Sequence, residues 1–337
     1  MDLKELWSVY HAAIPHCLQL ISEAPEIQRL QHIGMNCGCE YTSFPRFRNL
    51  RPYSRFQHSM GVGLIVWHFT ESPTQAVSAL LHDIATPVFA HVVDFLHGDH
   101  EKQESTEAAT ESLIAASSAI QTALSALDLP CEAVVDYHRY PIADNDSPLL
   151  SADRLEYTLG NLYNYGICSL PEIRSFYQDL TVTMNEENTP ELAFQTPEIA
   201  AAFTQSALQT ARIYIADEDR FAMQMLADLL KQALERGVLV PCDLHTTEST
   251  VIQKLLTDNV CAPLWQRFRS YSRVTRSAEV PDSGQWVRVP AKLRYIDPLA
   301  VGHGRVSQFD PRSGALLDDF RATRFDYWVG TDEKNKL

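Results

Sequence analysis

The sequence predicts a mainly α protein, a helical bundle with a small α/β appendage at its C-terminal end. Between residue 1 and about residue 260, apolar residues recur at intervals of three and four, the spacing that lines one face of a helix. Alternation of apolar and polar residues, typical of strands, becomes clear only after about residue 275. With 337 residues, 45% of them hydrophobic, the chain can build a sizeable core. We therefore expect a helical domain over residues 1–240 and a helical and β-hairpin region over 241–337 that packs on it.

Five segments carry the clearest helical pattern: residues 61–69, 74–85, 106–127, 154–165 and 219–237. Ser72 and Pro73 separate the first two segments, because proline breaks a helix. Thr74 then offers an N-cap for the second segment. Gly237 suits the left-handed position that follows the last turn of a helix, so it is expected to end the fifth segment.

Two stretches are expected to lie outside helices. Residues 181–197 are polar and contain two prolines, which predicts a loop or a short hairpin. Residues 283–306 alternate apolar and polar side chains between glycines and prolines, which predicts edge strands and hairpins. The appendage should therefore be built around short strands.

Composition restricts the classes of partner and the compartment. A formal net charge of -15 argues against a general electrostatic grip on nucleic acid or on an anionic membrane, while a small charged ligand needs only local cations. No stretch approaches the ~18 apolar residues of a transmembrane helix. The first residues are charged and contain no long apolar run, unlike a signal peptide. The seven cysteines form no CxxC pair, so neither disulfides nor a thiolate zinc site is indicated, and a cytoplasmic protein is expected.

Four residues form a candidate metal set: His58, the adjacent pair His82 and Asp83, and Asp153. Two imidazoles and two carboxylates supply the mixed nitrogen and oxygen donors that a divalent transition metal prefers. His58 stands at the opening of one expected helix and the pair near the end of the next, so an ion would lie where helices converge. Each residue alone is more often structural, as a core histidine or a helix-capping aspartate. The joint pattern predicts a metal-centred hydrolase.

A second pair, His91 and Asp94, has the three-residue spacing that places two side chains on one helical face. A carboxylate beside an imidazole raises its pKa and fixes its tautomer, as a general acid requires. The alternative interpretation is a surface ion pair.

The order and context of these residues resemble the HD-domain superfamily of metal-dependent phosphohydrolases. The matching stretches are residues 55–62 (RFQHSMGV), 82–83 (HD), 87–91 (PVFAH) and 152–157 (ADRLEY). The branch they look like is that of the deoxynucleoside triphosphate triphosphohydrolases. The resemblance implies an HD-type helical bundle whose four ligands hold one divalent ion of manganese, iron, cobalt, nickel, zinc or magnesium. Such an ion activates water for attack on phosphorus.

The resemblance also implies roles around the metal. Catalytic residues would be His91 with Asp94 and, on the other side of the site, His100 with Glu101. Substrate-binding residues would be Arg55, Thr86, Tyr157, Asn161 and Tyr214. Arg55 would bind phosphate oxygens in a fork, although holding an adjacent acidic side chain explains it equally well.

Three departures from the family pattern bear on the substrate. Thr86 stands where a histidine is usual, and it can hydrogen bond to phosphate but carries no charge. Met35 stands where a glutamine contacts the sugar. The acids at residues 217–219 would repel a triphosphate tail unless Arg220 or lysines elsewhere compensate.

We therefore expect a phosphohydrolase acting on a small phosphate compound, a nucleotide first. Triphosphate release ranks ahead of monoester or diester hydrolysis. A nucleotide-binding sensor without turnover is the alternative from another class, and a two-iron redox enzyme is a third that Thr86 argues against. Family members commonly assemble, so the strand-like region after residue 280 offers an interface for a homo-oligomer.

Overall fold

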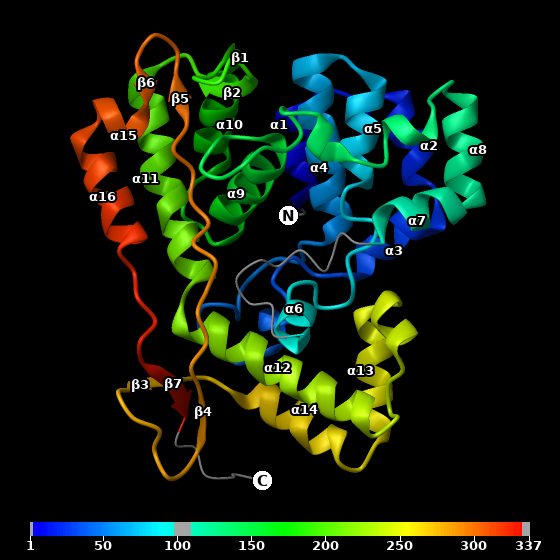
Figure 1. Ribbon diagram of the computed structural model, residues 1–337, viewed down its shortest axis with the longest axis vertical. Helices are drawn as coiled ribbons and strands as arrows, with labels where there is room; N and C mark the ends of the chain where they lie inside the picture. The colour runs from blue at the N-terminus through cyan, green and yellow to red at the C-terminus, as the bar shows by residue number, and fades with distance from the viewer. Residues whose placement is uncertain (1–2, 98–108, 332–337) are drawn as a thin grey trace.

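The computed structural model describes residues 3–97 and 109–331, and it is a mainly α fold as predicted (Figure 1). The helices of the first half are α1 (Trp7–Tyr10), α2 (His16–Ser22), α3 (Pro25–Arg29), α4 (Arg55–Thr70), α5 (Pro73–Leu81), α6 (Val92–His97), α7 (Thr110–Ala116), α8 (Ser118–Ala126) and α9 (Ala152–Asn164). Those of the second half are α10 (Leu170–Gln178), α11 (Pro197–Tyr214), α12 (Asp217–Glu235), α13 (Glu248–Thr257), α14 (Cys261–Ser270), α15 (Val306–Phe309) and α16 (Pro311–Arg321).

Helix α4 lies at the centre of the N-terminal bundle and packs against α5, α9 and α1. Its side chains are buried from Arg55 to Val66, so it has no solvent-facing stripe over its first three turns. Ser54 and Gln57 close its N-terminus as a capping box. Any polar side chain on this part of α4 is therefore held in the interior and needs a partner there.

The helix after α4 begins earlier than the sequence indicated. Ser72, not Thr74, is the N-cap of α5, and its side chain accepts a hydrogen bond from the backbone N–H of Gln75 at 3.4 Å. Pro73 occupies the first helical position, where a missing N–H costs nothing. The prediction that Thr74 caps the helix was wrong. The dipeptide Ser72-Pro73, which separates α4 from α5, also begins α5, with Ser72 as its N-cap.

Replacing Ser72 with alanine is expected to lower the free energy of unfolding by about 1 kcal/mol, because the N–H of Gln75 loses its acceptor. Thr74→Ala is the matched control and should change stability far less. Denaturant unfolding of both variants measures the difference. Equal losses for the two variants would contradict the capping role of Ser72.

For two of the expected helices, the structure agrees with the predicted end in one case and divides the predicted segment in the other. Within the described part of the 106–127 segment, Ser117 is extended and caps α8, so the pattern is divided into α7 and α8. The last long helix, α12, ends at Glu235, and Gly237 adopts the left-handed conformation with φ +69° as expected. The apolar spacing continued across Ser117 because both short helices pack on one core.

Short strands form two sheets. They are β1 (Leu180–Met184), β2 (Pro190–Phe194), β3 (Thr275–Ser277), β4 (Gln285–Val287), β5 (Leu299–Ala300), β6 (Gly304–Arg305) and β7 (Trp328–Thr331). β1 and β2 form the hairpin expected near residues 181–197, and the sheet orders are β1-β2-β5-β6 and β3-β7-β4. β2 pairs in parallel with β5, so the hairpin of the helical part and the C-terminal region share a sheet.

The C-terminal region is a small mixed α/β appendage, but fewer of its residues pair in strands than the alternation of apolar and polar residues predicted. Residues 288–298 belong to no helix or strand, and they run along α11 from one sheet to the other (Figure 1). Arg305 fastens β6 to β2, because its guanidinium contacts Glu191 at 2.6 Å while that carboxylate is fully buried. The division at residue 240 remains a prediction.

Two composition-based expectations concern membranes and cysteines. Among the described residues, none of the helices combines the length and the apolar character needed to cross a membrane. All seven cysteines are free thiols.

Candidate metal centre

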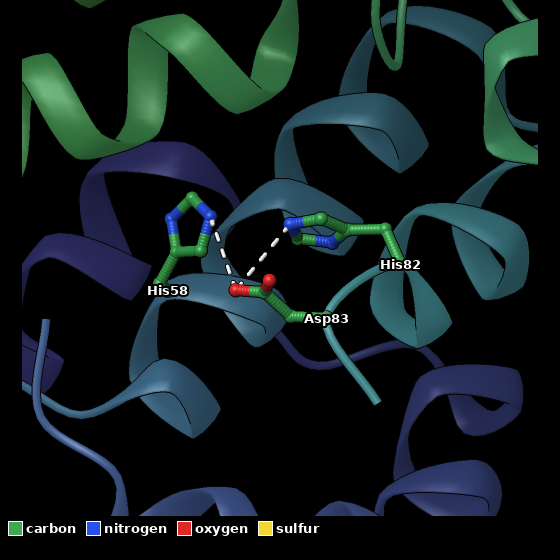
Figure 2. A group of neighbouring side chains, drawn as sticks. All are labelled: His58, His82 and Asp83. Atoms are coloured by element: carbon green, nitrogen blue, oxygen red, sulfur yellow. Dashed lines mark ion pairs between the residues drawn. The ribbon is translucent and has the colours of Figure 1, made fainter. Parts of the chain in front are cut away.

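The four predicted ligands come from three separate segments and meet at one point. His58 lies in the first turn of α4, His82 and Asp83 follow α5 directly, and Asp153 lies in the first turn of α9. Ligand atoms of the first three lie within 4.8 Å of one another, and Figure 2 shows both imidazoles facing the Asp83 carboxylate. Asp153 Oδ1 lies 3.0 Å from His58 Nε2 and 3.7 Å from His82 Nε2.

His82 is oriented by the helix that precedes it. Its Nδ1 donates to the carbonyl of Ala79 at 2.6 Å, which leaves the lone pair of Nε2 directed toward the two aspartates. Nε2 is buried and has no hydrogen-bond partner among the described residues, and it lies 3.6 Å from Asp83 Oδ2. A buried nitrogen lone pair that receives no hydrogen bond is suited to bind a metal ion.

His58 is oriented by Glu156, a residue to which the sequence assigned no role. Its Nδ1 lies 2.6 Å from Glu156 Oε2, and the carboxylate is almost fully buried. The hydroxyls of Tyr53 and Tyr10 also donate to Glu156. The carboxylate is thereby satisfied in the interior and holds the N–H of the imidazole, so that Nε2 faces the aspartates.

The backbone of α4 approaches Glu156 so closely that only glycine fits at one position. A Cβ atom at Gly61 would lie 2.6 Å from Cγ and from Oε1 of Glu156. Asp153 and Glu156 are three residues apart on α9, and this spacing was the available signal for the role of Glu156.

Asp83 is held by two side chains. Arg55 Nη1 contacts Oδ2 at 2.9 Å, and the hydroxyl of Thr86 donates to Oδ1 at 2.7 Å. Burial would raise the pKa of Asp83, but Arg55 and the two histidines lower it well below its usual range. The Asp83 carboxylate is therefore ionised. In this structure Arg55 and Thr86 both contact this carboxylate, which is itself a predicted metal ligand. Their expected phosphate contacts remain predictions.

The turn that carries Asp83 and Thr86 is anchored by Arg29, a residue to which the sequence analysis assigned no role. Its guanidinium donates to the carbonyls of Ile84 at 2.9 Å and Thr86 at 2.8 Å. An arginine that satisfies two backbone carbonyls fixes a short turn. Nothing in local periodicity could have revealed a contact across 55 residues.

A divalent transition-metal ion fits this donor set. The separations between imidazole nitrogens and carboxylate oxygens run from 3.0 to 3.9 Å. Bonds of ~2.1 Å place neighbouring ligand atoms roughly 3.0 to 3.4 Å apart, so small adjustments suffice. Burial would lower the pKa of His58, yet Asp153 and Glu156 raise it to about 10. The carboxylates thus concentrate negative charge that a cation would balance.

The second predicted pair is also formed. His91 lies just before α6, and its Nδ1 is 3.0 Å from Oδ2 of the fully buried Asp94. The expected rise in the pKa of His91 was wrong: burial lowers it, and the charges of Arg294 and Arg55 add to this against the effect of Asp94. His91 is therefore held as a neutral imidazole with Nδ1–H toward Asp94.

The predicted substrate residues of α9 and α11 form one wall. The rings of Tyr157 and Tyr214 lie 6.1 Å apart, edge to face, and the amide of Asn161 donates to the hydroxyl of Tyr214 at 2.8 Å. The ring of Tyr157 is 6.5 Å from that of His58, which places the wall beside the metal ligands. Such paired rings offer apolar surface next to a polar centre.

The acids at residues 217–219 are engaged by other groups. Asp217 pairs with Arg220 at 2.6 Å and with Arg276 at 2.5 Å. Asp219 accepts a weak hydrogen bond from the thiol of Cys39. Burial raises the pKa of Asp219 to about 7, which further reduces the negative charge of this stretch. Arg220 therefore compensates the charge of Asp217, the condition under which the expected repulsion of a phosphate tail is reduced.

Two predicted catalytic residues, His100 and Glu101, lie outside the described residues. The other eleven predicted site residues lie within the described part of the chain, and their assignment to one functional site remains a prediction. They are His58, His82, Asp83, Asp153, His91, Asp94, Arg55, Thr86, Tyr157, Asn161 and Tyr214.

Two curated proteins are similar in sequence. The metal-dependent phosphohydrolase cns2 of Cordyceps militaris is 26% identical over 303 residues, which cover 84% of this chain and 80% of that protein. The uncharacterized protein YdhJ of Bacillus subtilis is 27% identical over 238 residues, 70% of each chain. A scan against protein-family models gave no match.

Solved structures share the fold. A phosphohydrolase from Bacteroides thetaiotaomicron aligns with a TM-score of 0.67 at 16% identity, over 95% of this chain and 97% of the other. A hypothetical protein from Aquifex aeolicus aligns with a TM-score of 0.64, also at 16% identity, over 95% and 93%. These likenesses establish a shared mainly α architecture along nearly the whole chain.

Proposed function

We propose that this protein is a metal-dependent phosphohydrolase that cleaves a small phosphate ester, with nucleotides as the first substrate class. The observation that carries the proposal is the convergence of two imidazole Nε2 atoms and two carboxylates, with His82 Nε2 buried and unpaired within the part of the chain that the structure describes. The similarity to cns2 of Cordyceps militaris, a metal-dependent phosphohydrolase, supports the same chemistry.

The metal would be held by His58, His82, Asp83 and Asp153. A divalent ion bound there supplies an acidified water and polarises a phosphoryl oxygen. Ala79 and Glu156 keep the two imidazoles in the tautomer that presents Nε2.

The side chains beside the ligands would bind and orient the substrate. Arg55 holds Asp83 through Nη1, while its buried Nε has no hydrogen-bond partner in residues 3–97 and 109–331 and can donate to a phosphate oxygen. Because Asp94 holds Nδ1 of His91, Nε2 is the ring nitrogen that would exchange a proton with the substrate. The wall of Tyr157 and Tyr214 offers a surface for a sugar or base.

After a nucleoside triphosphate, an ester with a single phosphate is the second candidate substrate. The hydroxyl of Thr86 is committed to Asp83 and supplies no charge where the resembling family has a histidine. A monoester requires fewer cations than a triphosphate tail does.

Turnover that depends on a divalent metal is the expected result when the purified protein is incubated with Mn²⁺ and a panel of nucleoside mono- and triphosphates, sugar phosphates and diesters. Orthophosphate and triphosphate assays identify the bond that is cleaved. Chelation should stop turnover, and added Mn²⁺ should restore it, because the ion supplies the nucleophile.

The result that would overturn the proposal is an absence of turnover across the panel by protein that binds Mn²⁺. Thermal stabilisation by a nucleotide in that case would favour the sensor hypothesis. A protein that hydrolyses its substrate equally well in chelator and in Mn²⁺ would also contradict the proposal.

A further inference from the structure

The extended segment 288–298, which we call the strap, is fastened at both ends. At its start, the buried guanidinium of Arg220 donates to the carbonyl of Val289. At its end, the N–H of Asp297 donates to the carbonyl of Pro148 at 2.9 Å, and its carboxylate accepts from the N–H of Ser307 at 2.9 Å. The strap therefore has a defined path across the molecule although it forms no strand (Figure 1).

Between these anchors the strap carries Arg294 to the substrate side of the metal centre. Arg294 Nη2 lies 3.5 Å from His91 Nε2, across 203 residues of sequence. Burial raises the pKa of both Tyr157 and Tyr214, and the charge of Arg294 partly opposes the rise for each. One guanidinium thus contacts His91 and is near enough to the tyrosine wall for its charge to act on both hydroxyls.

We propose that Arg294 is a phosphate-binding residue of this site, delivered by the strap to bind the same phosphate that His91 contacts. The inference rests on the proposed function and extends it by naming the group that supplies positive charge. A guanidinium presents a planar fork that matches two phosphate oxygens. His91 Nε2 lies 3.5 Å from that fork, so the guanidinium and a protonated Nε2 can both donate to one anion.

The charge pattern of the centre supports this role. Arg55 is bound to Asp83, and Thr86 contributes a hydroxyl to the same carboxylate, so these two groups mainly serve the metal ligand. Asp94 adds a further negative charge behind His91. A substrate dianion entering here needs a cation on the His91 side, which Arg294 provides.

The alternative is that Arg294 only stabilises the strap. Variants separate the two roles: Arg294→Gln removes the charge, and Arg294→Lys keeps the charge without the fork. Arg288→Gln is the matched control on the same strap, since the Arg288 side chain is 51% exposed and lies 3.8 Å from Asp326.

Calorimetric titration of the Mn²⁺-loaded proteins with inorganic phosphate tests the proposal. Arg294→Gln is expected to weaken phosphate binding roughly 10- to 100-fold, because a hydrogen bond to a charged group is lost. Arg294→Lys should lose less, and Arg288→Gln should bind as the wild type does. Mn²⁺ affinity and the melting temperature should stay unchanged in all three.

Unchanged phosphate affinity in a folded Arg294→Gln variant would overturn the inference, as would a wild-type protein that binds Mn²⁺ but no phosphate. A loss of phosphate binding accompanied by an equal loss of Mn²⁺ binding or of thermal stability would assign Arg294 to the structure of the strap. The outcomes are separable from those of the proposed function. A wild-type protein that binds phosphate through Arg294 but hydrolyses none of the tested compounds would contradict the proposed enzymatic function. The phosphate-binding role of Arg294 would stand.

Discussion

Loss of metal-dependent turnover by roughly 1000-fold or more is expected when His82 is replaced by alanine, because a bound ion contributes several kcal/mol to the transition state. His82 offers its buried Nε2 to the centre, and no other described side chain donates to that atom. Asp83→Asn should have a similar effect, since an amide replaces an anionic ligand next to Arg55. Steady-state assays in Mn²⁺ and metal analysis of the purified variants measure both losses.

His68→Ala is the control for this prediction. His68 lies in the last turn of α4, packs against Phe69 and Tyr177, and belongs to the same helix as His58 but not to the metal centre. It should retain metal and turnover. If His82→Ala and Asp83→Asn bind no metal and still hydrolyse the substrate at the wild-type rate, catalysis does not run through these four ligands.

Glu156→Gln is expected to weaken Mn²⁺ binding roughly 10- to 100-fold while the protein stays folded, because this carboxylate orients a ligand and raises its basicity. The glutamine keeps the shape of the side chain and an oxygen that can accept from His58 Nδ1. It removes the negative charge and disturbs the donation from Tyr53 and Tyr10. Fluorescence or calorimetric titration with Mn²⁺ gives the affinity.

The control for Glu156→Gln is Glu198→Gln, a change at an exposed glutamate in the first turn of α11. It should leave Mn²⁺ affinity unaltered. Tyr53→Phe should have an intermediate effect, since one donor to Glu156 is lost and Tyr10 remains. Wild-type Mn²⁺ affinity in Glu156→Gln would show that Glu156 contributes only to packing beneath α4.

Local sequence patterns located most helices of the bundle but not all of their ends. The apolar spacing of α4 and α9 predicted both helices, because three- and four-residue periodicity is a property of the segment itself. The same periodicity could not show the break at Ser117, where two short helices keep their apolar residues on one core. Likewise, Ser72 and Thr74 are both good caps by composition, and the position of Pro73 decided between them.

For the candidate site, too, the sequence predicted one part and the tertiary structure decided the rest. The sequence by itself determined the types and order of the candidate ligands, since an adjacent His82 and Asp83 between His58 and Asp153 supplies donors that few structural roles require. Their mutual distances needed the packing of α4, α5 and α9.

Only the tertiary structure decided which groups support the ligands. Glu156 reaches His58 across 98 residues, and Arg294 reaches His91 across 203, on a strap without regular structure. Such contacts depend on how whole elements pack and on where irregular backbone is anchored, here by Arg220 and Asp297. Periodicity and motif spacing describe one segment at a time, so they carry no information on pairings of this length.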